Sequence, residues 1–200
     1  MGIEVLRSKS GVILNQRKYV LELVSDLGLS GARVANTPLE CNLKLTTMEY
    51  DKAIGVKGDE MLEDINKYQK LIWRLMYITI TRPDINFAVQ TLSQFMQASK
   101  KSHWEAATRL VRYLRGIVGQ GIWLQATEAN KLTCWRDSYW ASCPNTRRSV
   151  TGYVVKLGDS LISRKSKKQQ TLSRSSAEAK YRSMASTIAK IHGCWGCAKS

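Results

Sequence analysis

Long hydrophobic runs are absent from this sequence. No stretch of about 18 consecutive apolar residues occurs, which is the length that a helix needs to cross a bilayer. The opening MGIEVLRSKSG also lacks the apolar segment of a secretory signal. We therefore expect an intracellular protein, cytoplasmic or nuclear and not secreted, without a membrane partner.

The cysteines do not form a pairing pattern. They number five and are irregularly spaced, which argues against a disulfide framework. Cys194 and Cys197, near His192, have the spacing of half a zinc site or of a redox pair. Neither arrangement has its complement elsewhere in the sequence. We predict reduced thiols and no functional metal site in this tail.

Acidic residues are scarce in the last quarter of the chain. Residues 143–200 contain 12 Lys and Arg against 2 Asp and Glu, within a chain of net charge +15. Such a surplus is typical of a surface that contacts nucleic acid. It is also what remains when a region has lost acids, and the composition alone does not separate the two.

Hydrophobic periodicity predicts a hairpin, then helices, in the first 120 residues. Alternation over residues 3–14 around RSKSG indicates the hairpin, and residues 15–28 have helical spacing. An irregular segment over 29–63 follows, and then three helices within DINKYQKLIWRLMYITI, RPDINFAVQTLSQFMQ and KSHWEAATRLVRYLRG. In the last of these, Ser102 and Glu105 match a capping box.

The basic face of that last helix carries Arg109, Arg112 and Arg115. It has two interpretations, a solvated helix surface or a contact with a phosphate backbone.

From Gly121 onward the period changes from helix to strand. GIWLQ, LTCWRD, GYVVKLG and LISRKS predict four strands that lead into a helix, an α+β arrangement with a mainly antiparallel sheet. Ser175 and Glu178 match a capping box at the start of that helix. Its predicted buried stripe is Ala177, Tyr181, Met184 and Ile188.

Several long phrases resemble one family. LTCWRDSYWASCPNTRRSVTGYVVKLGDSLISRKSKKQQTLSRSSAEAKYRSMA is similar to the RNase H-type segment of copia-type LTR retrotransposon Pol polyproteins. YQKLIWRLMYITITRPDINFAVQTLSQFMQ and HWEAATRLVRYLRGI resemble the part that precedes it, and residues 2–40 resemble the end of the reverse transcriptase region. The resemblance covers residues 2 to about 191.

The resemblance implies a domain order. Residues 1–40 would be the end of the reverse transcriptase region (hairpin plus helix), 41–63 an irregular connector, 64–120 a helical connection, and 121–200 a truncated RNase H-like domain. The fold class would be α+β, with thumb- or connection-like elements followed by an incomplete mixed sheet and one packed helix.

The resemblance also implies which chemistry is missing. Members of the family hydrolyse the RNA strand of a hybrid with Mg²⁺ ions held by several carboxylates, because one carboxylate binds such an ion weakly. Asp137 matches the first family acid, but Lys180 stands where the pattern has Glu, and the remaining acids would follow residue 200. The acidic Asp-Asp loop of the polymerase would precede Met1. We therefore expect no enzyme activity, no cofactor and no small-molecule substrate.

Basic residues that match family positions remain candidates for contacts with nucleic acid. In the last quarter of the chain these are Arg147, Arg148, Lys165, Lys167, Lys168 and Arg174. The prediction is a degenerate, inactive Pol fragment. Two alternatives stay open: a non-enzymatic binder with weak affinity for an RNA–DNA hybrid or duplex backbone, and a piece of an active protein truncated by gene prediction.

Overall fold

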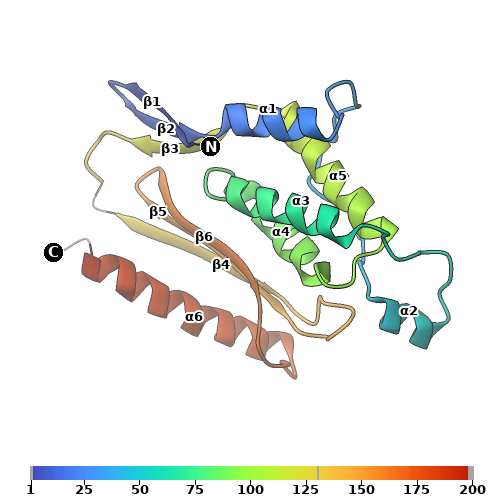
Figure 1. Ribbon diagram of the computed structural model, residues 1–200. Helices are drawn as coiled ribbons and strands as arrows, with labels where there is room; N and C mark the ends of the chain where they lie inside the picture. The colour runs from blue at the N-terminus through green and yellow to red at the C-terminus, as the bar shows by residue number, and fades with distance from the viewer. Residues whose placement is uncertain (1, 130, 198–200) are drawn as a thin grey trace. The chain divides into compact units, whose positions relative to one another are not determined.

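The computed structural model describes residues 2–129 and 131–197 (Figure 1). For residues 194–197 it describes the backbone alone. Two compact units divide the chain between Trp123 and Leu124. Within the described ranges, helices accompany two three-stranded antiparallel sheets, which confirms the predicted α+β class.

The first unit begins with the predicted hairpin. Strands β1 (Glu4–Ser8) and β2 (Gly11–Asn15) pair antiparallel, with Glu4 opposite Asn15. Helix α1 (Arg17–Asp26) follows, and the Asn15 side chain accepts a hydrogen bond from the backbone N–H of Arg17 at 3.0 Å. Gly28 has a φ of 67°, a left-handed conformation that suits glycine after a helix end.

The third strand of this sheet corrects one prediction. Strand β3 (Gly121–Gln125) lies beside β2 instead of starting a four-stranded run with the later strands. A Cβ at Gly121 would lie 2.1 Å from the carbonyl oxygen of Leu14, so glycine permits this close backbone approach. The sequence pattern identified the strand but not its partner.

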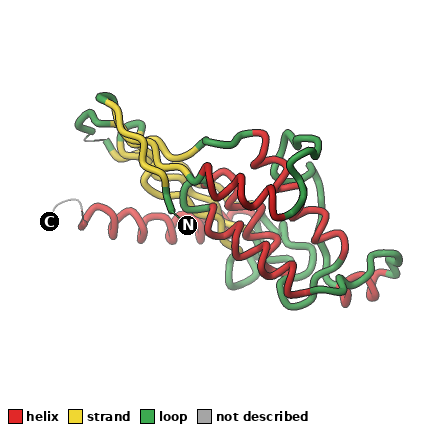
Figure 2. Tube along the Cα trace, turned by 45° about the horizontal axis from the view of Figure 1, so that its top comes forward, coloured by secondary structure: helices red, strands yellow, loops and turns green. Residues whose placement is uncertain are grey.

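Four helices supply the core of the first unit: α1, α3 (Ile65–Ile78), α4 (Asn86–Leu92) and α5 (Lys101–Gly116). Figure 2 shows them gathered together in red. Their buried faces include Leu23, Leu75 and Leu110. The Tyr68 hydroxyl donates to the Leu92 carbonyl at 2.8 Å, and burial raises the pKa of this phenol.

Three predictions for this unit need correction. The segment expected to be irregular contains a short helix, α2 (Met48–Ile54). The helix expected over 82–97 is shorter, with the 3₁₀ turns η1 (Pro83–Ile85) and η2 (Ser93–Phe95) on either side of α4. The third is the start of α5. His103 Nδ1, not Glu105, accepts the Lys100 backbone N–H at 3.0 Å, because Ser102 is engaged with Asp59.

The second unit is a sheet with one helix packed on it. Strands β4 (Leu132–Tyr139), β5 (Val150–Leu157) and β6 (Ser160–Lys168) pair antiparallel in that order, so the described sheet is not the predicted mixed one. Helix α6 (Ser176–Cys197) packs on β4 and β5. On the other face of the sheet, Trp135 and Tyr139 are 54% and 69% exposed.

Ser175 caps α6 as predicted, but Glu178 bonds the N–H before Ser175 instead of completing the capping box, and the predicted buried stripe is wrong. Ser175 Oγ accepts the Glu178 backbone N–H at 3.2 Å, and the Glu178 carboxylate accepts the Arg174 N–H at 2.7 Å. The buried side chains are Ala179, Ser183 and Thr187, whereas Tyr181 and Ile188 are exposed. The helix is therefore rotated from the phase that apolar residues alone predict.

Candidate functional site

The two positions that the family pattern singles out lie at one contact between β4 and α6. The Arg136 guanidinium donates to the carbonyl oxygen of Lys180 at 3.1 Å. The Ser183 hydroxyl donates to the carbonyl oxygen of Asp137 at 3.2 Å. The structure therefore brings position 137 on the strand and position 180 on the helix into one neighbourhood.

The side chains at this contact offer few metal ligands. Asp137 is exposed, and one of its carboxylate oxygens accepts the Ser138 backbone N–H at 2.7 Å. Both hydrogen bonds at this contact end on backbone carbonyl groups, and side chains alternate along β4, so the Asp137 carboxylate lies on the sheet face of Trp135 and Tyr139, opposite that of Arg136. Across the described ranges, no three His, Cys, Asp or Glu side chains converge on a common point. This donor set does not fit the Mg²⁺ ions that the family chemistry needs. In the His192, Cys194 and Cys197 motif, the two cysteine side chains lie outside the described residues.

The predicted basic face of α5 is largely engaged within the chain. Arg109 donates to Glu40 Oε1 and to Thr37 Oγ1, each at 3.1 Å. Arg115 donates to the carbonyl oxygen of Ala32. These bonds hold the segment after α1 against α5, and they use donors that a phosphate would otherwise take.

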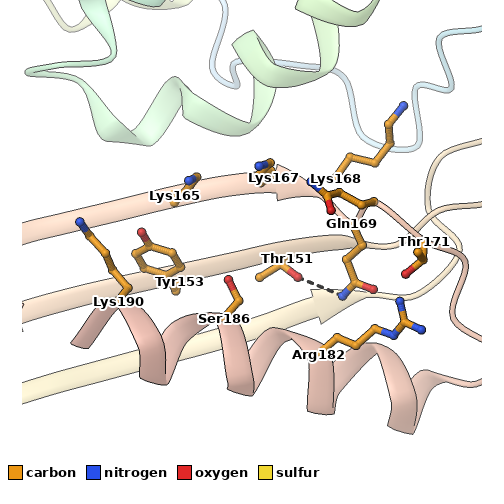
Figure 3. A pocket seen from close by; sticks show the side chains of 11 residues that line it. Thr151, Tyr153, Lys165, Lys167, Lys168, Gln169, Thr171, Arg182, Ser186 and Lys190 are labelled. Atoms are coloured by element: carbon orange, nitrogen blue, oxygen red, sulfur yellow. Dashed lines mark hydrogen bonds between the residues drawn. The ribbon is translucent and has the colours of Figure 1, made fainter. Parts of the chain in front are cut away.

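The basic residues of the second unit separate into two sets. Arg147, Arg148 and Arg174 lie on the loops before β5 and α6. Lys165, Lys167 and Lys168 of β6 instead line a cavity of about 510 Å³, which Figure 3 shows between that strand and α6.

Sequence reasoning missed the cations on the helix side of this cavity. Arg182 and Lys190 line it from α6, with Ser186 between them, and no Asp or Glu is among its lining residues. The spacing of four residues from each to the next places all three on one helix face, and that spacing was the available signal. The wrong phase assigned to α6 concealed it.

Comparisons with known proteins place the chain in a family, although no family model and no solved structure matches it. A retrovirus-related Pol polyprotein from transposon RE2 of Arabidopsis thaliana is 37% identical over 197 residues, covering 98% of this chain and 13% of the relative. The corresponding polyprotein from transposon TNT 1-94 of Nicotiana tabacum is 30% identical over 184 residues, which are 90% of this chain and 14% of that protein.

This chain belongs to the copia-type Pol polyprotein family. It spans about an eighth of the length of these polyprotein relatives. A shorter relative, an uncharacterized mitochondrial protein of Arabidopsis thaliana, is 32% identical over 193 residues, covering 96% of this chain and 75% of the relative. In the described part of this Pol segment, no helix is both long and apolar enough to cross a membrane.

Proposed function

We propose that this chain is a degenerate Pol segment that runs from the end of a reverse transcriptase region into an incomplete RNase H-like domain and hydrolyses no phosphodiester bond. The proposed divisions are residues 1–40, 41–63, 64–120 and 121–200, as the resemblance implies. The observation that supports inactivity is that position 137 of β4 lies beside position 180 of α6, which carries a lysine. Hydrogen bonds from Arg136 to the Lys180 carbonyl and from Ser183 to the Asp137 carbonyl join the two positions.

The electrostatics at that contact support the same proposal. Two-metal hydrolysis stabilises the attacking and leaving oxygens with divalent cations. A lysine at position 180 and an arginine at 136 repel such cations, whereas an acid at 180 would attract them. One exposed carboxylate, that of Asp137, does not offset this repulsion.

A cleavage assay tests this proposal. The full chain is incubated with an RNA–DNA hybrid labelled on the RNA strand, in Mg²⁺ and separately in Mn²⁺. We expect no cleavage above that of the Asp137→Asn variant, and Lys180→Glu alone restores none, because a second carboxylate at this contact still makes no set of three among the described residues. Metal-dependent cleavage that Asp137→Asn abolishes would show instead that the chain is an active nuclease.

A second candidate function is sequence-independent binding of a nucleic-acid backbone. The cavity lined by cations from β6 and α6 favours it, because phosphate contacts by Lys and Arg provide affinity without base readout. The predicted residues Arg147, Arg148 and Arg174 would extend this surface. Titration of the full chain with an oligonucleotide measures such binding.

A further inference from the structure

The cavity of the second unit is lined by two rows of cations. Lys165 and Lys167 are two residues apart on one face of β6, which places their Cα atoms about 6.6 Å from each other. Arg182 and Lys190 are eight residues apart on α6, a rise of about 12 Å along the helix. Figure 3 shows the two rows on opposite sides of the cavity, with Thr151 and Tyr153 between them.

The cavity has a fixed, neutral floor. Gln169 donates to Thr151 Oγ1 at 3.0 Å and to the Ala179 carbonyl at 3.0 Å, while the Ser173 hydroxyl donates to Gln169 Oε1 at 2.9 Å. Since Thr151 Oγ1 accepts from Gln169, its own hydrogen remains available. Among the described hydrogen bonds neither Thr151 nor Tyr153 donates its hydroxyl, so both can donate to a ligand.

The charge of the cavity is only partly balanced within the chain. Arg182 pairs with Glu178 at 2.6 Å, and Lys168 Nζ lies 3.8 Å from Cys143 Sγ. For Lys165, Lys167 and Lys190, the described residues provide no ion pair. Cations that converge in this way repel one another, and an anion placed between them relieves that repulsion.

The size of the cavity distinguishes the class of anion. A volume of about 510 Å³ is within the range of small-ligand sites, and it leaves ample room around one phosphate. Within each row the cations are several ångströms apart, so the cavity matches a ligand that carries several negative charges close together. Hydroxyl donors on the floor match phosphoryl oxygens, which are strong acceptors.

We infer that this cavity binds closely spaced phosphate groups. They belong either to a soluble polyphosphate or to consecutive units of a nucleic-acid backbone, and both present the same chemistry to Lys165, Lys167 and Thr151. The ligand is bound and not transformed. This inference does not rest on the loss of hydrolysis, and only its backbone source rests on the second candidate function.

Calorimetric titration of the full chain tests the site. The probes are inorganic tripolyphosphate, inorganic phosphate, and a 12-nucleotide oligothymidylate. We expect tripolyphosphate to bind at one site per chain, and inorganic phosphate to bind at least tenfold more weakly. The double variant Lys165→Gln/Lys167→Gln is expected to weaken tripolyphosphate at least tenfold, and Thr151→Val about fivefold.

The matched control removes the same charge elsewhere in the unit. Lys131→Gln/Lys156→Gln changes two lysines that line a different cavity. We expect its tripolyphosphate affinity to stay within twofold of the unmodified chain. Equal losses in the two double variants would mean that net charge alone drives binding, and the inferred site would be wrong. Failure of both tripolyphosphate and the oligonucleotide to saturate would also refute it.

The oligonucleotide arm separates the two phosphate sources. If oligonucleotide affinity falls only in the Lys165→Gln/Lys167→Gln variant, and tripolyphosphate does not saturate, the cavity binds a nucleic-acid backbone. If that variant loses tripolyphosphate but keeps the oligonucleotide, the cavity binds soluble polyphosphates, and the nucleic acid contacts another surface. The second candidate function then survives while its location changes.

Discussion

At the scale of single residues, the first unit buries a charged cluster at the start of α5. The Lys100 ammonium contacts Asp51, and lies 2.8 Å from Asp59 Oδ2. Burial alone would raise the pKa of each carboxyl, but hydrogen bonds from Lys100 and from Thr46 or Ser102, together with the Lys100 charge, leave both pKa values lowered. Removal of either partner would leave an uncompensated buried charge, so the cluster joins residues 46–59 to α5.

His103 makes this cluster sensitive to pH. Burial, reinforced by the Lys100 charge, lowers the pKa of the imidazole to about 4 from 6.5, although Asp59 and Asp51 oppose the shift. Between these values the unfolded chain binds a proton that the folded chain excludes. We expect the free energy of unfolding of the first unit to fall by about 2–4 kcal/mol as the pH drops from 7 to 4.

Urea unfolding at successive pH values measures this fall. His103→Gln should flatten the profile above pH 4, because Gln can still accept the Lys100 N–H but does not titrate. His192→Gln is the control, since that histidine is exposed and lies in the second unit. A profile that stays steep in His103→Gln would assign the dependence to other groups.

At the scale of elements, helix α6 shows why the site was only partly predictable. The family motif singled out Asp137 and Lys180 without any knowledge of packing, and their roles stay predictions. The orientation of α6 depended instead on how closely it packs on the sheet. Small residues at 179, 183 and 187 permit close packing, and the hydroxyls of Ser183 and Thr187 are satisfied by backbone carbonyls. The periodicity of apolar residues gives no information on which face of the helix can pack this closely on the sheet.

Strand β3 depends on one glycine for its place in the first sheet. Gly121→Ala would force a methyl group against the Leu14 carbonyl, so we expect β3 to shift and the first unit to lose roughly 1–3 kcal/mol of stability. Thermal unfolding measures the loss. Gly31→Ala is the control, because a Cβ at Gly31 meets no atom within 4 Å. Equal melting temperatures for the two variants would refute the packing argument.

At the scale of the whole molecule, the two units differ in how much apolar surface they bury. Helices of the first unit share one extended core. In the described part of the second unit, the buried apolar side chains are few: Cys143, Tyr153, Val155 and Ala179. Stability scales with buried apolar area, so the second unit should be the weaker.

We therefore expect unfolding in two transitions. Hydrogen exchange followed by mass spectrometry should show residues 124–197 losing protection at a lower urea concentration than residues 2–123. Val155→Ala should lower only the urea midpoint of residues 124–197, and Leu110→Ala should lower only that of residues 2–123. A single cooperative transition for both segments would contradict this expectation.

The chain-wide pattern was predictable where local rules suffice and less so where distant segments meet. The alternation around RSKSG predicted the first hairpin, and the helical period predicted α1, α3 and α5. The division of strands between two sheets was not predictable, because it depends on contact between Gly121 and Leu14, more than a hundred residues apart. The buried Lys100 cluster was also missed, because Lys100 is far along the chain from its partners Asp51 and Asp59.

The exposure of Lys180 has an evolutionary consequence. Its side chain forms no hydrogen bond or ion pair with the described residues, so folding does not distinguish lysine from glutamate at this position. On the function proposed above, an acid at position 180 would matter only for hydrolysis, and loss of hydrolysis would remove the selection against lysine there. In a lineage that has lost this chemistry but keeps the fold, we expect codon 180 to vary freely and codon 183 to stay constrained, because buried Ser183 joins α6 to β4.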